Sequence, residues 1–254
     1  MTELVELNNK KHLDLRVKPS SNVALAAKQQ IMKLRVTEVA KAVTSFPVFF
    51  TRDPRNGAWV LSALSSFEQN QNLFVKQHRW DTAFQPTSVQ THPIYLMQSP
   101  HKDNSYTLGI VEQSDAFSNE DGEPLFDSKG RPSLYLSRIQ KLLEADINND
   151  FHTIKFSEKL TELGLLKEIN LSIQYHDDSV QNLNGLHTLD EDKLQSLTEQ
   201  QLVELYKLGY LVPIHAMLIS IYQLNTLVKK SNEVQGARAV KQLKIEVARD
   251  PNAL

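Results

Sequence analysis

The chain has 254 residues, of which 41% are apolar and 23% charged, a composition that suits one large domain or two interleaved subdomains and excludes a disordered chain. Its 28 basic and 30 acidic side chains give a formal net charge of −2 without a block of like charge, so nucleic acid is not an expected partner. Cysteine is absent from the sequence, which excludes disulfides, thiolate metal sites and cysteine nucleophiles.

The first half of the chain is rich in short strand patterns. Residues 13–18 alternate as a strand does, whereas residues 36–43 place three valines and an alanine on one helical face. Further segments of apolar and β-branched residues predict strands at 72–75, 93–97 and 106–111.

The segment 46–64 has the composition of a hairpin. Residues 46–50 and 58–64 are aromatic and β-branched, and the linker 51–57 contains an Asp-Pro and an Asn-Gly pair, both of which favour turns. Apolar side chains occupy both parities of the two runs. This predicts an antiparallel pair with both faces covered.

The second half is dominated by helical patterns. A second hairpin is expected at 169–189, where two alternating segments flank a polar turn. Thr198–Gln201 has the spacing of a capping box, which predicts a helix start. The predicted helices are 132–148, 156–164, 190–197, 202–209 and the segment after Pro213.

Residues 208–228 contain no charged side chain and are long enough to span a bilayer. They also carry a histidine, a proline and several hydroxyl and amide side chains, which are costly in lipid. The sequence therefore predicts a core helix and no membrane span.

Together these elements predict an α+β fold. We expect a single domain over residues 1–230, with a strand-rich part (10–115) containing antiparallel hairpins and a helix-rich part (131–230) packed on it. The remaining tail, 231–254, has a weakly helical pattern and an end that is expected to fray.

Several segments resemble the SapC family in their order over most of the chain. The matching pieces are HLDLRVKP, FPVFFTRDPRNGAWVLSAL, FEQNQNLFV, RWDTAFQP, EPLFDSKGRPSLYL, NGLHTLDEDKLQSL and HAMLISIYQLNTL, and together they cover roughly residues 10–230. The chain departs from the family pattern at Phe46, where members carry tyrosine, and at 70–72, where members carry Gly-Glu-Asn.

The resemblance links the chain to a group of bacterial systems and does not imply a chemical reaction. The family is named after a bacterial surface-layer locus, and its members are described as encoded near TonB-dependent receptors, cupin-like proteins and flavin-dependent halogenase-like proteins. It brings no established activity and no catalytic residue to this chain. We therefore expect an accessory protein of a bacterial surface or TonB-dependent uptake system.

Two short motifs are candidates for a ligand-binding or partner-binding face. Arg52 and Asp53 lie in the predicted hairpin turn, where Asp53 also suits a purely structural capping role. Arg79, Trp80 and Asp81 combine two residue types that are favoured at interfaces, although Trp80 equally suits a core position. The partner expected for this face is a protein or a small ligand.

A second interpretation is a non-haem iron oxygenase. His101 and Asp103 have the His-x-Asp spacing of such enzymes, and His152, His176 or His187 could supply a third ligand. The tripeptide lies in a polar loop, however, whereas a rigid strand would hold ligands better. We therefore expect no metal, no cofactor and no catalytic residue.

The sequence thus favours a non-catalytic binding protein over an enzyme. The N-terminal segment lacks a basic region followed by an apolar run, which predicts a cytoplasmic protein without a signal peptide. A structural component of a surface array is the third interpretation, and it would require export.

Overall fold

In the computed structural model, the described residues (4–102, 105–236 and 238–248) form two compact units that interleave along the chain. The first unit contains the residues up to Lys28 together with Val75–Asp81 and Thr87–Asn148. The second unit contains Gln29–Phe74, Thr82–Pro86 and the residues from Asn149 onward.

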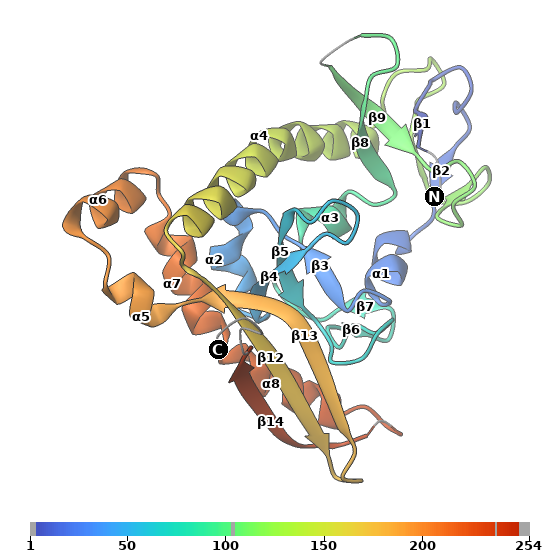
Figure 1. The fold of residues 1–254 in the computed structure, drawn as a ribbon. Helices are drawn as coiled ribbons and strands as arrows, with labels where there is room; N and C mark the ends of the chain where they lie inside the picture. The colour runs from blue at the N-terminus through green and yellow to red at the C-terminus, as the bar shows by residue number, and fades with distance from the viewer. Residues whose placement is uncertain (1–3, 103–104, 237, 249–254) are drawn as a thin grey trace. The chain divides into compact units, whose positions relative to one another are not determined.

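The first unit contains short antiparallel strands and two short helices (Figure 1). One sheet has the order β1-β9-β8, a second has the order β10-β2-β11, and β6 pairs with β7. The strands are β1 (Val5–Glu6), β2 (Arg16–Val17), β6 (Val75–Lys76), β7 (Arg79–Trp80), β8 (Ile94–Gln98), β9 (Tyr106–Ile110), β10 (Phe117–Ser118) and β11 (Glu123–Pro124), and the helices are α1 (Ser21–Ala26) and α3 (Thr87–Gln90).

The core of this unit joins the two three-stranded sheets to the long helix α4 (Leu134–Glu162). Leu136, Ile139 and Leu143 recur at helical spacing along α4 and are buried. They pack in one cluster with strand residues that include Val17 and Ile110. The remaining buried members of the cluster are Ile94, Phe117, Leu125 and Phe126.

The second unit contains a six-stranded antiparallel sheet in the order β14-β12-β13-β4-β5-β3 (Figure 1). Its strands are β3 (Ile31–Lys33), β4 (Val48–Arg52), β5 (Trp59–Leu64), β12 (Leu166–Tyr175), β13 (Val180–Leu189) and β14 (Val240–Val247). The helical segments of the unit are η1 (Val36–Glu38), α2 (Val39–Ala42), α5 (Glu191–Gln195), α6 (Glu199–Lys207), α7 (Leu211–Ser220) and α8 (Gln223–Asn232).

Both predicted hairpins are confirmed. β4 pairs with β5 from Val48 opposite Ala63 to Arg52 opposite Trp59, and β12 pairs with β13 along most of its length. Phe49 and Phe50 are consecutive and therefore point to opposite faces of the sheet, yet both are almost fully buried. The hairpin is thus covered on both faces, as its composition predicts.

Helix α6 begins as predicted. The Thr198 hydroxyl accepts from the backbone N–H of Gln201, and the Gln201 side chain accepts from the backbone N–H of Thr198. This reciprocal capping box satisfies two N–H groups that would otherwise lack partners at the helix start.

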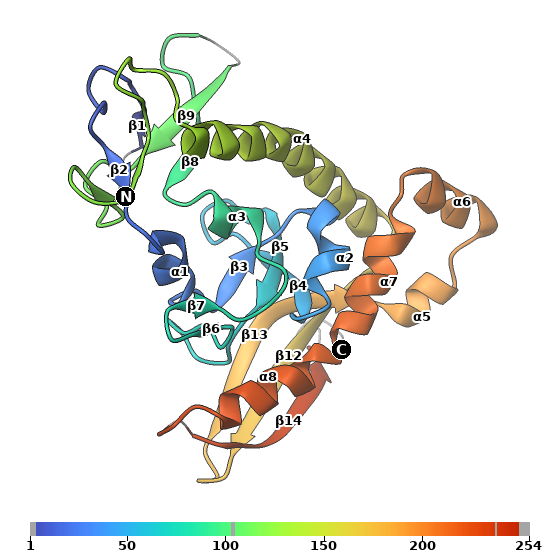
Figure 2. The same ribbon diagram turned by 180° about the vertical axis from the view of Figure 1, so that it is seen from behind.

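Two sequence-based predictions about helices need correction. The predicted helices 132–148 and 156–164 are one continuous helix, α4. The tail after residue 231 is not helical as predicted, because Val240–Val247 forms β14 and pairs with β12, extending the sheet by one strand. Figure 2 shows α8 running beside this strand. The predicted fraying falls at 249–254, which lie outside the described residues.

The apolar segment forms α7 and the start of α8, with a break at Ile221 and Tyr222 (Figure 2). By length and composition alone, Leu211–Asn232 could cross a bilayer, since the mean hydropathy of its most apolar window is 1.5. A share of 33% of that window is buried inside the protein. Helix α7 buries Ile214 and Met217 and packs on β4 and β13. The absence of a membrane span stays a prediction.

The fold is therefore α+β with antiparallel sheets, as the sequence predicts. Strands are mostly in the N-terminal half and helices mostly in the C-terminal half. The long strands β12 and β13 are the main exception, since they lie between α4 and the C-terminal helices in the chain.

Gly122 provides a test of the small sheet around β2. Its φ is +115°, and a Cβ there would lie 2.1 Å from the carbonyl oxygen of Val17, which β10 and β11 hold in place on either side. We expect Gly122→Ala to lower the free energy of unfolding by more than about 3 kcal/mol. Gly130→Ala is the matched control, because its Cβ would meet only the Asn9 side-chain amide, at 3.3 Å. Equal urea midpoints for the two variants would contradict the expectation.

Candidate functional site

The predicted turn residues Arg52 and Asp53 are engaged inside their own hairpin. The Arg52 guanidinium lies 3.3 Å from the centre of the Trp59 ring and donates to the carbonyl oxygen of Gly57 at 2.9 Å. Asp53 accepts from the backbone and the guanidinium of Arg55, which lowers the pKa of its carboxyl group to about 2. These contacts of the two side chains therefore lie within the hairpin, as a structural role would require.

Trp59 connects this turn to the rest of the second unit. Its indole N–H donates to the Thr161 hydroxyl at 3.0 Å, and its ring meets the edge of His187 with centroids 4.7 Å apart. Burial lowers the pKa of His187. The cluster thus anchors the hairpin to α4 and β13.

The other three candidates lie in the first unit. Arg79 and Trp80 form β7, and Asp81 lies 3.9 Å from the Lys76 ammonium. The five residues of the predicted face are therefore divided between the two units, with Arg52 and Asp53 in the second. The face stays a prediction.

The residues of the iron-site alternative are only partly described. His101 is exposed, and its Nε2 lies 3.2 Å from the Glu6 carboxylate. Asp103 lies outside the described residues. Among the residues that the structure describes, no three His, Asp or Glu side chains come together as a metal site would require.

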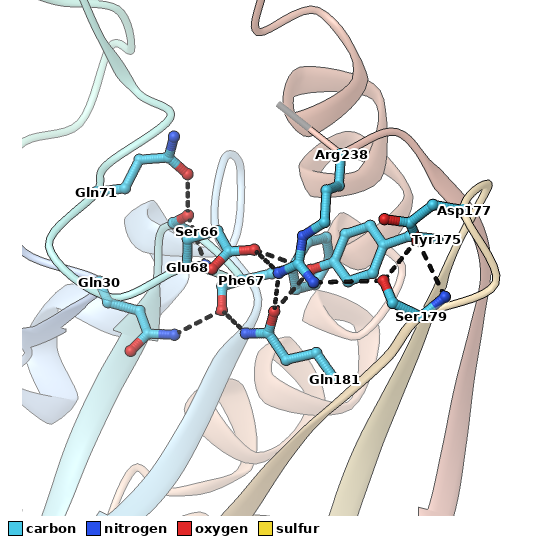
Figure 3. A network of polar contacts seen from close by, with 10 residues as sticks. All are labelled: Gln30, Ser66, Phe67, Glu68, Gln71, Tyr175, Asp177, Ser179, Gln181 and Arg238. Carbon is cyan, nitrogen blue, oxygen red and sulfur yellow. Dashed lines mark hydrogen bonds and ion pairs between the residues drawn. The ribbon is translucent and has the colours of Figure 1, made fainter. Parts of the chain in front are cut away.

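A polar network in the second unit holds the chain around Arg238 (Figure 3). The Arg238 guanidinium lies 4.1 Å from the centre of the Tyr175 ring and donates to Glu68 at 2.7 Å and to Gln181 at 3.0 Å. The Tyr175 hydroxyl lies 2.8 Å from the same Gln181 oxygen, and Gln181 donates to the carbonyl oxygen of Phe67. Burial first, and then the Glu68 carboxylate, raise the pKa of Tyr175 to about 12, so this tyrosine stays protonated. The network joins Glu68 to β12, to β13 and to the segment before β14.

The first unit has two open hollows that share lining residues, and we call them the Arg138 hollow, whose lining is mainly polar, and the α1 hollow, whose lining is mainly apolar. The Arg138 hollow has a volume of about 440 Å³ and the α1 hollow about 550 Å³. Both are lined by His92 and by residues 18–21. The Arg138 hollow is lined by Val17, Lys18, Pro19, Ser20, Ser21, Asn22, Gln90, His92, Glu123, Leu134, Tyr135 and Arg138.

His92 lies at the inner wall of both hollows and is only 8% exposed. Its Nδ1 lies 2.9 Å from the Tyr95 hydroxyl, and burial lowers the pKa of its imidazole to about 4. The ring is therefore neutral at neutral pH. A general base works best with a pKa near the operating pH, so this imidazole is poorly suited to moving protons.

The charged lining residues of the Arg138 hollow do not neutralise one another. Lys18, Arg138 and Glu123 are exposed, and none of them forms an ion pair or side-chain hydrogen bond with any residue that the structure describes. Arg138 and Glu123 instead act on Tyr135, whose pKa is raised chiefly by burial. The hollow offers charged and neutral donors to a ligand and lacks an activated nucleophile among its described residues.

Sequence analysis did not identify this site. Its residues come from positions near 18, 90, 123 and 138, and no local motif links them. His92 stands out in the sequence only as a histidine before a proline, and Lys18 only as the last residue of a predicted strand.

A comparison with protein families gives a single result. A family model described as SapC matches residues 7–227, which is most of the chain. No curated protein and no solved structure matches this sequence.

The neutral state of His92 predicts how stability depends on pH. Its pKa is about 4 in the folded protein and near 6.5 when unfolded, so the unfolded chain binds the extra proton first as pH falls. We expect the free energy of unfolding to fall by about 2 kcal/mol between pH 7 and pH 5 because of this residue, and His92→Gln to remove that part of the slope. Chemical denaturation at both pH values measures it. An unchanged slope in the variant would contradict the expectation.

The network around Arg238 predicts a cost for removing one hydroxyl. Tyr175→Phe takes away the donor to Gln181 while keeping the ring under Arg238, and we expect the free energy of unfolding to fall by about 1 kcal/mol. Tyr206→Phe is the control, because the Tyr206 side chain is 73% exposed and should change stability by less than about 0.5 kcal/mol. Equal effects in urea denaturation would show that the Tyr175 hydroxyl contributes nothing to stability.

Proposed function

This chain belongs to the SapC family, and on that premise we propose that it is a non-catalytic binding protein whose ligand occupies the Arg138 hollow. The observation that carries the proposal is the combination of an open polar hollow with charged side chains that have no partner in the described structure. The free-energy cost of binding a ligand is low for such side chains, because no existing ion pair must be broken.

The chemistry of the wall supports binding rather than catalysis. Among the described residues that line the Arg138 hollow, His92 alone carries an imidazole, which has a pKa of about 4 and already contacts Tyr95. Without a base near neutral pH, the serine hydroxyls of the wall have no described group that would activate them. A ligand held there would leave chemically unchanged.

The biological setting that we propose comes from the family. The family is named after a bacterial surface-layer locus, and its members are described as encoded near TonB-dependent receptors, so we propose an accessory role in such a system. In this role the bound ligand would be the cargo or the signal that the system handles. A cytoplasmic location is part of the proposal, and cell fractionation tests it.

Retention of a solute from a cell extract tests the proposed function. We expect the purified protein to retain a small molecule from a metabolite extract of the source cells, detected by mass spectrometry after gel filtration and unaltered after hours of incubation. Ser21→Trp places a large ring in the wall of the hollow and should reduce retention at least about tenfold.

Ser128→Trp is the control for the added ring. Ser128 lies in an exposed turn of the same unit and does not line the hollow. The proposal is wrong if the unmodified protein retains nothing, if Ser21→Trp retains as much as the control, or if the solute is chemically converted.

A further inference from the structure

We infer that the ligand of the Arg138 hollow is a small oxyanion, bearing a carboxylate or phosphate group that Lys18 and Arg138 bind together. The inference rests on the proposed function, because it names the chemical class of the ligand for the same site. The residues that line the Arg138 hollow support the inference by their charges, their hydrogen-bond donors and their protonation states.

Two cations line one hollow although their positions in the chain are far apart. Lys18 follows β2 directly, and Arg138 lies in the second turn of α4. Two like charges that share a concave surface repel each other, and an anion between them relieves the repulsion while forming charge-assisted hydrogen bonds. Two other arginines of the same unit are already engaged, since Arg16 donates to the carbonyl oxygen of Gly122 and Arg131 pairs with Asp127.

The net charge of the hollow is positive. Lys18 and Arg138 contribute two positive charges, Glu123 contributes one negative charge, and His92 is neutral above its pKa of about 4. Glu123 forms no ion pair with either cation, so it does not occupy the place that we assign to the anion.

The neutral side chains add donors at the same wall. Ser20, Ser21 and Asn22 line the hollow beside Lys18 and supply hydroxyl and amide groups. A carboxylate or phosphate group is anionic and carries several acceptor lone pairs. It can therefore accept hydrogen bonds from the cations and from the neutral donors of this wall. The α1 hollow adds one cation, Lys28, and one carboxylate, Asp115, and so does not cancel the positive charge.

Titration with simple anions tests the inference. The probes are inorganic phosphate for the phosphate group and citrate for the carboxylate group, followed at pH 7 by two-dimensional NMR of the ¹⁵N-labelled protein. We expect at least one probe to shift the amide signals of Lys18, of residues 20–22 and of the residues around Arg138 with saturation, and its affinity to fall as sodium chloride is raised.

Charge-removing variants assign the binding to the two cations. Lys18→Gln and Arg138→Gln should each weaken the probe about tenfold, and the double variant should abolish saturable binding. Lys141→Gln is the control, because Lys141 lies three residues further along α4, is exposed and does not line the hollow. Lys18 and Arg138 are exposed, so these variants should remain folded, and thermal denaturation checks it.

The outcomes separate the two proposals. If neither anion binds, or if Lys141→Gln weakens binding as much as Arg138→Gln, the oxyanion assignment is wrong. If the solute retained from the cell extract is neutral or cationic, the assignment also fails, but the binding function survives. If no solute is retained at all, the binding function itself fails.

Discussion

The need to bury both faces of the β4–β5 hairpin organises the second unit. Phe49 and Phe50 point to opposite faces, so helices or loops must cover each side. Phe156 of α4 lies 6.0 Å from the Phe50 ring and in turn meets Tyr210. The charged side chains of the turn, Arg52, Asp53 and Arg55, make their contacts within the hairpin itself.

A binding site needs side chains that the fold does not use. In the hairpin turn, Arg52 is stacked and hydrogen-bonded, and the Asp53 carboxylate accepts three bonds from Arg55. In the Arg138 hollow, by contrast, the charged lining side chains have no partner among the described residues. Whether a charged side chain is available to bind a ligand therefore depends on whether it already has a partner in the fold, and not on how unusual its sequence motif is.

Sequence reasoning succeeded where the determinant is local. The hairpin at 46–64 follows from its composition and turn pairs, and the start of α6 follows from the four residues of its capping box. It failed where the determinant is distant. The strand β14 exists because β12, some seventy residues earlier in the chain, offers an open edge, and the hollow exists because distant segments meet. No local pattern carries that information.

The residues that fold the first unit also position its proposed ligand groups. Lys18 directly follows Val17, a member of the buried cluster, and its backbone N–H donates to the carbonyl oxygen of Ala116 at 2.9 Å. Arg138 directly precedes Ile139, which lies in the same cluster. Because a buried neighbour fixes the backbone beneath each cation, only side-chain freedom remains to be lost when a ligand binds, and that lowers the entropic cost of binding.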